Sequence, residues 1–118
     1  MFEITKRFTI EAAHYLPRVP ENHSCGNVHG HSYAIEIGVV GEVDDHGWVM
    51  DFGDIGEAFN PIRDALDHRL LNDVRGLENP TSEILSQWVY NSLLATVPAL
   101  AWVKVYETAT SSCLYRRR

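Results

Sequence analysis

Residues 28–41 read Val28-His29-Gly30-His31-Ser32-Tyr33-Ala34-Ile35-Glu36-Ile37-Gly38-Val39-Val40-Gly41. From Tyr33 onward every second side chain is apolar, and a period of two predicts a strand with one buried face. His29 and His31 are in phase with that buried face. Residues 2–14 alternate in the same way and end on a histidine in phase with their own apolar side chains. The two segments most simply form an antiparallel pair.

The middle of the chain changes its period. Apolar residues recur every three or four positions over 55–66, which predicts an amphipathic helix, and Pro61 within it predicts a kink or a late start. Residues 67–79 then read as a loop. A second helix follows, for which Asn79 is a candidate cap and Pro80 occupies the first turn. Its buried stripe continues to Leu93, and Pro98 ends it.

Alternation returns near the end, over 102–107 and 113–115, after a short strand or strand end at 48–50. Two strands, two helices and two strands predict an α+β fold. We expect a four-stranded antiparallel sheet with both helices on one face, in the order ββααββ.

Length and composition restrict the class of protein. The 118 residues favour one domain spanning 1–118, and a net charge of −6 disfavours a nucleic-acid-binding surface. No apolar stretch reaches the roughly 20 residues that cross a bilayer. Charges at Glu3, Lys6 and Arg7 stand where a signal peptide would be apolar. A cytoplasmic location with reduced cysteines is therefore expected.

Three histidines predict a metal centre. Alternate strand residues point to one face, so His29 and His31 can converge on one ion, and His14 can supply a third nitrogen from the neighbouring strand. Three imidazoles on Zn²⁺ leave a fourth position open, as in catalytic sites. Zinc is favoured by the ligand type, although Fe²⁺ or Mn²⁺ is compatible with the spacing. Unrelated polar residues at strand ends are the alternative.

Cys25 lies four residues before His29, in a polar loop. A thiol near a metal and imidazoles is expected to have a lowered pKa. It could be a nucleophile, a general base, a fourth zinc ligand or an inert residue. Cys113 falls in a strand and is interpreted as structural.

Two acidic positions complete the candidate residues. Asp67 next to His68 can fix the imidazole tautomer and raise its basicity, although such neighbours are also common on surfaces. Glu107 points toward the predicted core, where a carboxylate must be paired or bind something. A heterocycle with a planar N–H edge matches a carboxylate in two hydrogen bonds, and an ion pair with an arginine is the alternative.

Together these residues resemble the 6-pyruvoyl-tetrahydropterin synthase family. The similarity covers nearly the whole chain, and the short Cys-to-His interval is similar to the 6-carboxy-tetrahydropterin synthase branch of that family. The motifs that carry it are Glu11-Ala12-Ala13-His14, Cys25-Gly26-Asn27-Val28-His29-Gly30-His31, Leu66-Asp67-His68, Asn79-Pro80-Thr81-Ser82-Glu83 and Glu107-Thr108.

The resemblance implies the tunnelling fold, in which sheets of several subunits close into a barrel with active sites between subunits. A homo-oligomer is expected, with a hexamer favoured. The implied reaction converts 7,8-dihydroneopterin triphosphate to 6-carboxy-5,6,7,8-tetrahydropterin, acetaldehyde and triphosphate, in queuosine and other deazapurine pathways.

The resemblance also suggests a role for each site residue. Zinc on the three histidines would hold the substrate side chain. Cys25 would be the base, and Asp67 and His68 would form a proton relay. Glu107 would be the pterin anchor and would also share in the relay, with further substrate contacts from Thr81 and Thr108. Formation of the 6-pyruvoyl product on the same scaffold, and a non-catalytic oligomer that binds pterin or metal, are the alternatives.

Overall fold

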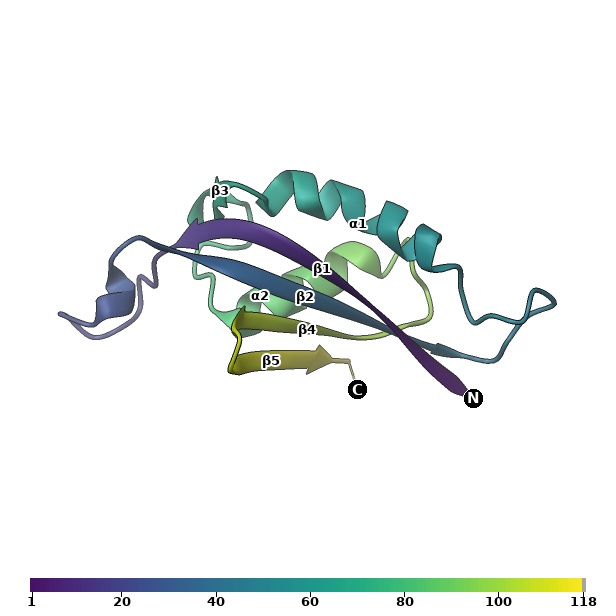
Figure 1. Ribbon diagram of the computed structural model, residues 1–118. Coiled ribbons are helices and arrows are strands. Elements are labelled where there is room, and N and C mark those ends of the chain that lie inside the picture. The colour runs from purple at the N-terminus through teal and green to yellow at the C-terminus, as the bar shows by residue number, and fades with distance from the viewer. Residues whose placement is uncertain (118) are drawn as a thin grey trace.

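The computed structural model describes residues 1–117 as a curved sheet flanked by two helices (Figure 1). Arg118, the last residue of the predicted domain, lies outside the described residues. No helix within 1–117 is long and apolar enough to cross a membrane. In chain order the elements are β1 (Phe2–His14), the short 3-10 turn η1 (Ser24–Gly26), β2 (His29–Gly41), α1 (Phe52–Leu66), β3 (Arg69–Leu70), the 3-10 turn η2 (Leu71–Asp73), α2 (Ser82–Leu93), β4 (Leu100–Thr108) and β5 (Ser111–Arg116).

The predicted pair of β1 and β2 is present. The strands run antiparallel over their whole lengths, from Phe2 opposite Gly41 to His14 opposite His29. β4 then pairs antiparallel with β2, and β5 with β4. The central strands are long because apolar and polar side chains alternate along most of their length, with Lys6 an exception on β1.

The expectation of four antiparallel strands is wrong, because the sheet has five strands in the order β3-β1-β2-β4-β5 and is mixed. β3 pairs parallel with the end of β1, with Arg69 opposite Ala12. The chain leaving α1 is held there by a hydrogen bond from the His68 amide to the Glu11 carbonyl, with N···O 2.6 Å. Two residues are too few to show a period, so the sequence predicted a loop.

Both helices cover one face of the sheet, as predicted. The buried side chains of the sheet and of the helices form one hydrophobic core. Ile35 and Val105 on the sheet are fully buried, as are Phe59 of α1 and Val89 of α2. Each fully buried side chain of this size stabilises the fold by roughly 1.5–3 kcal/mol relative to exposure.

Three local predictions are corrected. α1 runs without interruption from Phe52 through Pro61, so a late start is wrong. Thr81, not Asn79, caps α2, because the Thr81 hydroxyl accepts a hydrogen bond from the Ile84 amide at 3.2 Å, and Pro80 therefore precedes the first turn. Residues 48–50 form a bend rather than a strand, since the Asp44 amide donates to the Trp48 carbonyl and closes a local turn.

Candidate metal centre and active site

Strand register brings three imidazoles together. His14 ends β1 directly opposite His29, which begins β2, and His31 follows on the same face of β2. Side chains directly opposite each other on antiparallel strands are neighbours. One ligand atom from each of the three rings lies within 4.8 Å of the other two. This histidine cluster could therefore hold a metal ion.

The orientation of two rings is fixed by backbone carbonyls. His14 Nδ1 lies 2.9 Å from the Pro80 carbonyl oxygen, and His29 Nδ1 lies 2.7 Å from the Asn27 carbonyl oxygen. A carbonyl can only accept, so each Nδ1 carries the proton and donates. In the neutral ring Nε2 then keeps a free lone pair. Such outer contacts are typical of metal-binding histidines.

The free nitrogens face one another. Nε2 of His14 and Nε2 of His29 are 3.1 Å apart, and two lone pairs at this distance repel unless a cation lies between them. Ligand atoms around a tetrahedral zinc ion are separated by about 3.3 Å, given Zn–N bonds of about 2.0–2.1 Å. Nε2 of His31 is buried and has no hydrogen-bond partner among the described residues. The cluster fits a divalent metal, and imidazole ligands suit zinc.

Burial also suits His14 to this task. The side chain is fully buried. Burial lowers the pKa of His14 below its ordinary value, and the carbonyl of Pro80 and the carboxylate of Glu107 only partly oppose this effect. A neutral imidazole is the form that binds a metal. His14 is therefore ready to act as a ligand near neutral pH.

Tyr33 packs beneath the histidine cluster. The sequence interpretation missed this role because it treated Tyr33 only as a core residue. Its hydroxyl lies 3.2 Å from His14 Nδ1, and its ring packs edge-on against His14 and His31. Burial raises the pKa of Tyr33, so its hydroxyl stays protonated. The position of Tyr33, two residues after His31 on one strand face, was the available signal.

Glu107 lies beside the cluster. Its Oε1 is 3.4 Å from His14 Nε2 and 3.8 Å from His31 Nε2. The residue stands near the end of β4, one position after Tyr106, which pairs with Ala34. Among the described residues its ionic contacts are these imidazoles, so the alternative of an arginine partner is not what the structure shows.

Asp67 and His68 form the predicted pair, at the outer edge of β1. Asp67 accepts a hydrogen bond from the Glu11 amide at 2.8 Å, and His68 Nδ1 lies 3.0 Å from the second carboxylate oxygen. The Glu11 amide and His68 together lower the pKa of Asp67. The His68 backbone adopts φ of 58° and its side chain is 77% exposed. Within residues 1–117, no hydrogen bond or ion pair joins either side chain to the histidine cluster.

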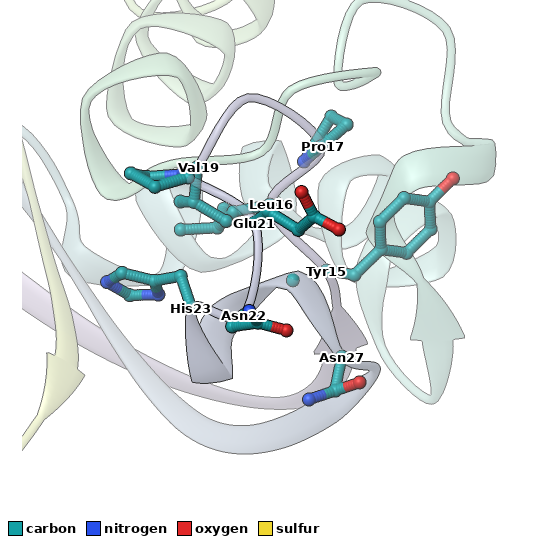
Figure 2. Close-up of a pocket in the computed structure, with 10 residues that line it drawn as sticks. Tyr15, Leu16, Pro17, Val19, Glu21, Asn22, His23 and Asn27 are labelled. Carbon is teal, nitrogen blue, oxygen red and sulfur yellow. The ribbon is translucent and has the colours of Figure 1, made fainter.

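Cys25 lies in the loop that connects His14 to His29. The Leu16 amide donates to the Cys25 carbonyl at 2.8 Å and closes the base of this loop, and Cys25 is half-buried. The loop encloses a pocket of about 530 Å³, whose lining side chains include Tyr15, His23 and Asn27 (Figure 2). Among the described residues the thiol is not one of the groups that converge with the imidazoles, which disfavours Cys25 as a fourth ligand.

Asn72, on η2, is a second residue that the sequence interpretation missed. Its side-chain oxygen accepts from the Tyr15 amide at 3.0 Å, and its NH₂ donates to the Tyr15 carbonyl at 2.8 Å. The amide thereby pairs with the backbone just after His14, much as another strand would. A lone asparagine in a predicted loop gave no signal of this role.

The two threonines of the predicted substrate site have local partners. Thr81 caps α2, directly after Pro80, whose carbonyl orients His14. The Thr108 hydroxyl accepts a hydrogen bond from the Thr110 amide at 3.3 Å in the turn between β4 and β5. Contact of either threonine with a substrate stays a prediction.

Comparison with known proteins decides the family. A family model described as 6-pyruvoyl tetrahydropterin synthase matches residues 3–118. The chain belongs to this family. The resemblance seen in its motifs is thus confirmed.

Curated relatives of this 6-pyruvoyl tetrahydropterin synthase family member narrow the comparison. The chain is 39% identical to the 6-carboxy-5,6,7,8-tetrahydropterin synthase of Synechocystis sp., over 98% of this chain and 93% of that protein. It is 34% identical to the enzyme of the same name from Bacillus subtilis, over 98% of this chain and 85% of that protein. These names indicate a pterin-processing enzyme.

Solved structures agree on the fold of the family member. The 6-pyruvoyl tetrahydropterin synthase of Caenorhabditis elegans superposes with a TM-score of 0.90 at 25% identity, over 99% of this chain and 96% of that one. Because the similarity spans nearly both chains, the five strands and two helices together constitute the family's fold.

Proposed function

We propose that this chain converts 7,8-dihydroneopterin triphosphate to 6-carboxy-5,6,7,8-tetrahydropterin, acetaldehyde and triphosphate in a zinc-dependent reaction. The observation that carries the proposal is the histidine cluster, in which the free nitrogens of His14 and His29 face each other beside the unpartnered nitrogen of His31. The names of the Synechocystis and Bacillus relatives support the choice of product.

Glu107 anchors the pterin in this proposal. A carboxylate can accept two parallel N–H bonds from the aminopyrimidine edge, which is a strong and directional arrangement. Its place beside the histidine cluster brings the pterin and its side chain close to the metal ligands. When bound, zinc supplies Lewis acidity that acidifies the substrate's side-chain hydroxyls and neighbouring protons.

Proton transfers are assigned to the remaining predicted residues. Cys25, as thiolate, is the base that takes protons at the pterin C6 and the side-chain carbons. His68 moves protons through Nε2, because its Nδ1 is held by the Asp67 carboxylate. Asp67 itself is fixed by the Glu11 amide, so it orients the ring and need not leave its place.

The separation of these groups supports an active site between subunits. Within one chain His68 points to solvent from the edge of β1, and no hydrogen bond or ion pair among the described residues joins it to the histidine cluster. A second copy can supply the missing pair if sheets of several subunits close into a barrel, and closure also covers the free strand edges. We therefore propose a homo-oligomer, with a hexamer favoured.

The pathway assignment rests on resemblance. The short interval between Cys25 and His29 is similar to the 6-carboxy branch, so we propose that the product enters queuosine biosynthesis. The cytoplasmic location stays a prediction.

Product analysis tests the proposal. The purified protein is incubated with 7,8-dihydroneopterin triphosphate, with zinc, with a chelator, and after zinc is restored. We expect acetaldehyde and 6-carboxy-tetrahydropterin by mass spectrometry, loss of both on chelation and recovery with zinc. A 6-pyruvoyl product without acetaldehyde would assign the alternative activity, and tight pterin binding without turnover would assign a binding protein.

A further inference from the structure

Its role as pterin anchor explains why Glu107 lies near the histidine cluster, but not why its carboxylate is turned toward the imidazole nitrogens. An anchor needs only to face the pterin edge, whereas the Glu107 carboxylate oxygen is turned toward two imidazole nitrogens, 3.4 Å from His14 Nε2 and 3.8 Å from His31 Nε2. Its side chain is 29% exposed, so solvent does not fully screen the carboxylate. The contact therefore has an energetic consequence.

Without a cation this contact is unfavourable. The proton of His14 is on Nδ1, where it is donated to the Pro80 carbonyl, so Nε2 presents a lone pair. A lone pair and a carboxylate at 3.4 Å repel each other, as do the lone pairs of His14 and His29 at 3.1 Å. Both contacts become favourable when one cation lies among these atoms.

We propose that, in the absence of substrate, Glu107 is the fourth ligand of the metal held by His14, His29 and His31, and that the pterin substrate displaces it. Co-ligand atoms around tetrahedral zinc are about 3.3 Å apart. The observed separations of 3.1, 3.4 and 3.8 Å lie near this value. The second half of the inference rests on the proposed function, because it requires that the substrate is a pterin.

Other candidates for the fourth place are less suited. In the described chain, neither Cys25 nor Glu107 is in the group whose ligand atoms all lie within 4.8 Å of one another, but the Glu107 carboxylate lies 3.4 Å from His14 Nε2 and 3.8 Å from His31 Nε2. The oxygens of Asp67 are engaged by the Glu11 amide and by His68 at the edge of β1. Glu107 is the acidic residue that reaches the histidine cluster within residues 1–117.

The exchange would have a chemical use. One carboxylate and three neutral imidazoles leave the centre with a net charge of +1, which is less acidifying than the +2 left by the imidazoles alone. Coordination by Glu107 thus keeps the Lewis acidity of the metal low until a pterin binds. The aminopyrimidine edge would then hydrogen-bond to the carboxylate, and a substrate hydroxyl could bind at the vacated coordination position.

Zinc binding without substrate tests the first half. Metal-free parent, Glu107→Gln and Glu36→Gln proteins are titrated with zinc against a coloured chelator. Glu36 is a matched control because it is a half-buried carboxylate on β2 whose partner is Arg7, away from the cluster. We expect Glu107→Gln to lose about tenfold or more in zinc affinity, since even a lost outer-shell partner costs 10–100-fold. Glu36→Gln should match the parent.

Infrared difference spectra identify the ligand. Adding zinc should shift a carboxylate stretching band in the parent and in Glu36→Gln but not in Glu107→Gln, and 7,8-dihydroneopterin should reverse the shift. Equal zinc affinity of Glu107→Gln and parent, or the same band shift in both, would overturn the ligand role. A shift that persists with bound pterin would overturn the exchange.

Two controls distinguish a lost metal ligand from misfolding of the variant, and the ligand role from the proposed function. Equal thermal midpoints of the metal-free proteins show that Glu107→Gln is folded, and Glu107→Asp, whose carboxylate is one methylene shorter, is expected to lose zinc affinity too. If the parent releases acetaldehyde and Glu107→Gln binds zinc as tightly as the parent, the ligand role of Glu107 is refuted and the proposed function stands. If the parent releases no acetaldehyde but Glu107→Gln binds zinc more weakly than the parent, the proposed function is refuted and the ligand role stands.

Discussion

His14 and His68 are both tied through Nδ1 to an oxygen, yet they are placed for different tasks. His14 is fully buried, and its free nitrogen faces other imidazoles of the same chain. His68 is 77% exposed, and its free nitrogen is available outside the chain. The neutral carbonyl beside His14 sets a tautomer for binding a cation, whereas the carboxylate beside His68 holds the ring in place with Nε2 directed outward. In the proposed function these two similar side chains serve as a metal ligand and as a proton carrier, and burial and the partner atom are what distinguish them.

The largest effect should come from breaking the buried site. His29→Ala removes one of three nitrogens, so we expect zinc affinity to fall by more than about 100-fold and turnover to disappear, measured by metal analysis and acetaldehyde release. His46→Ala is the control, because His46 is exposed in a turn. A His29→Ala protein with a full complement of zinc would contradict the ligand assignment.

Removal of the exposed imidazole of His68 should reduce turnover without reducing zinc affinity. His68→Ala is expected to keep parental zinc affinity and to lose about 10²–10⁴-fold in turnover, the range typical of a lost general acid or base. Metal analysis and kinetics on one preparation measure both. Lost zinc together with lost turnover would show that the two sites are not separate.

Substitution of each cysteine tests whether Cys25 is the catalytic base. Cys25→Ala should reduce turnover by about 10²-fold or more at unchanged zinc content, because the thiol is proposed as the base. Cys113→Ala should retain turnover, since Cys113 is half-buried near Ser86, on β5. Parental turnover of Cys25→Ala would exclude this residue as the base.

Tyr33→Phe tests the surroundings of the buried site without removing a ligand. The ring that packs against the imidazoles is kept and only the hydroxyl near His14 is lost. We expect zinc affinity to fall by about tenfold, the low end for outer contacts of metal ligands. Chelator competition measures this, and nitrogen NMR shifts of His14 would reveal a changed tautomer. Unchanged values of both would assign Tyr33 to packing alone.

The smallest effect concerns the acidic partner of His68. The pKa of Asp67 is lowered in the folded chain, chiefly by the Glu11 amide and by His68, so its ionised form stabilises the fold above the unfolded value of about 3.9. This contribution is lost as pH falls through the lower folded value. The difference in thermal midpoint between the parent and Asp67→Asn should therefore shrink as the pH falls below about 4. A difference independent of pH would contradict this cause.

Long periodic segments and the buried site could be predicted from the sequence because both depend on strand alternation. The phase of His29 and His31 with the apolar side chains, together with the expected antiparallel pairing of the two segments, placed them beside His14. The two-residue strand β3 and the hydrogen bonds of the Asn72 side chain to the Tyr15 backbone could not be predicted. Each depends on where the chain that follows α1 packs against the end of β1. For the same reason the carbonyl of Pro80 and the position of Glu107 beside the cluster appeared only with the structure.

The contact between His14 and the Pro80 carbonyl joins the histidine cluster to a helix. Pro80 directly precedes Thr81, whose hydroxyl caps α2, so the ring of His14 rests on the backbone that starts this helix. Any fraying of the first turn of α2 would displace the acceptor that fixes the ring. Metal occupancy and the local opening of α2 are therefore thermodynamically linked, and loading the centre should slow amide hydrogen exchange in a helix that contributes no ligand.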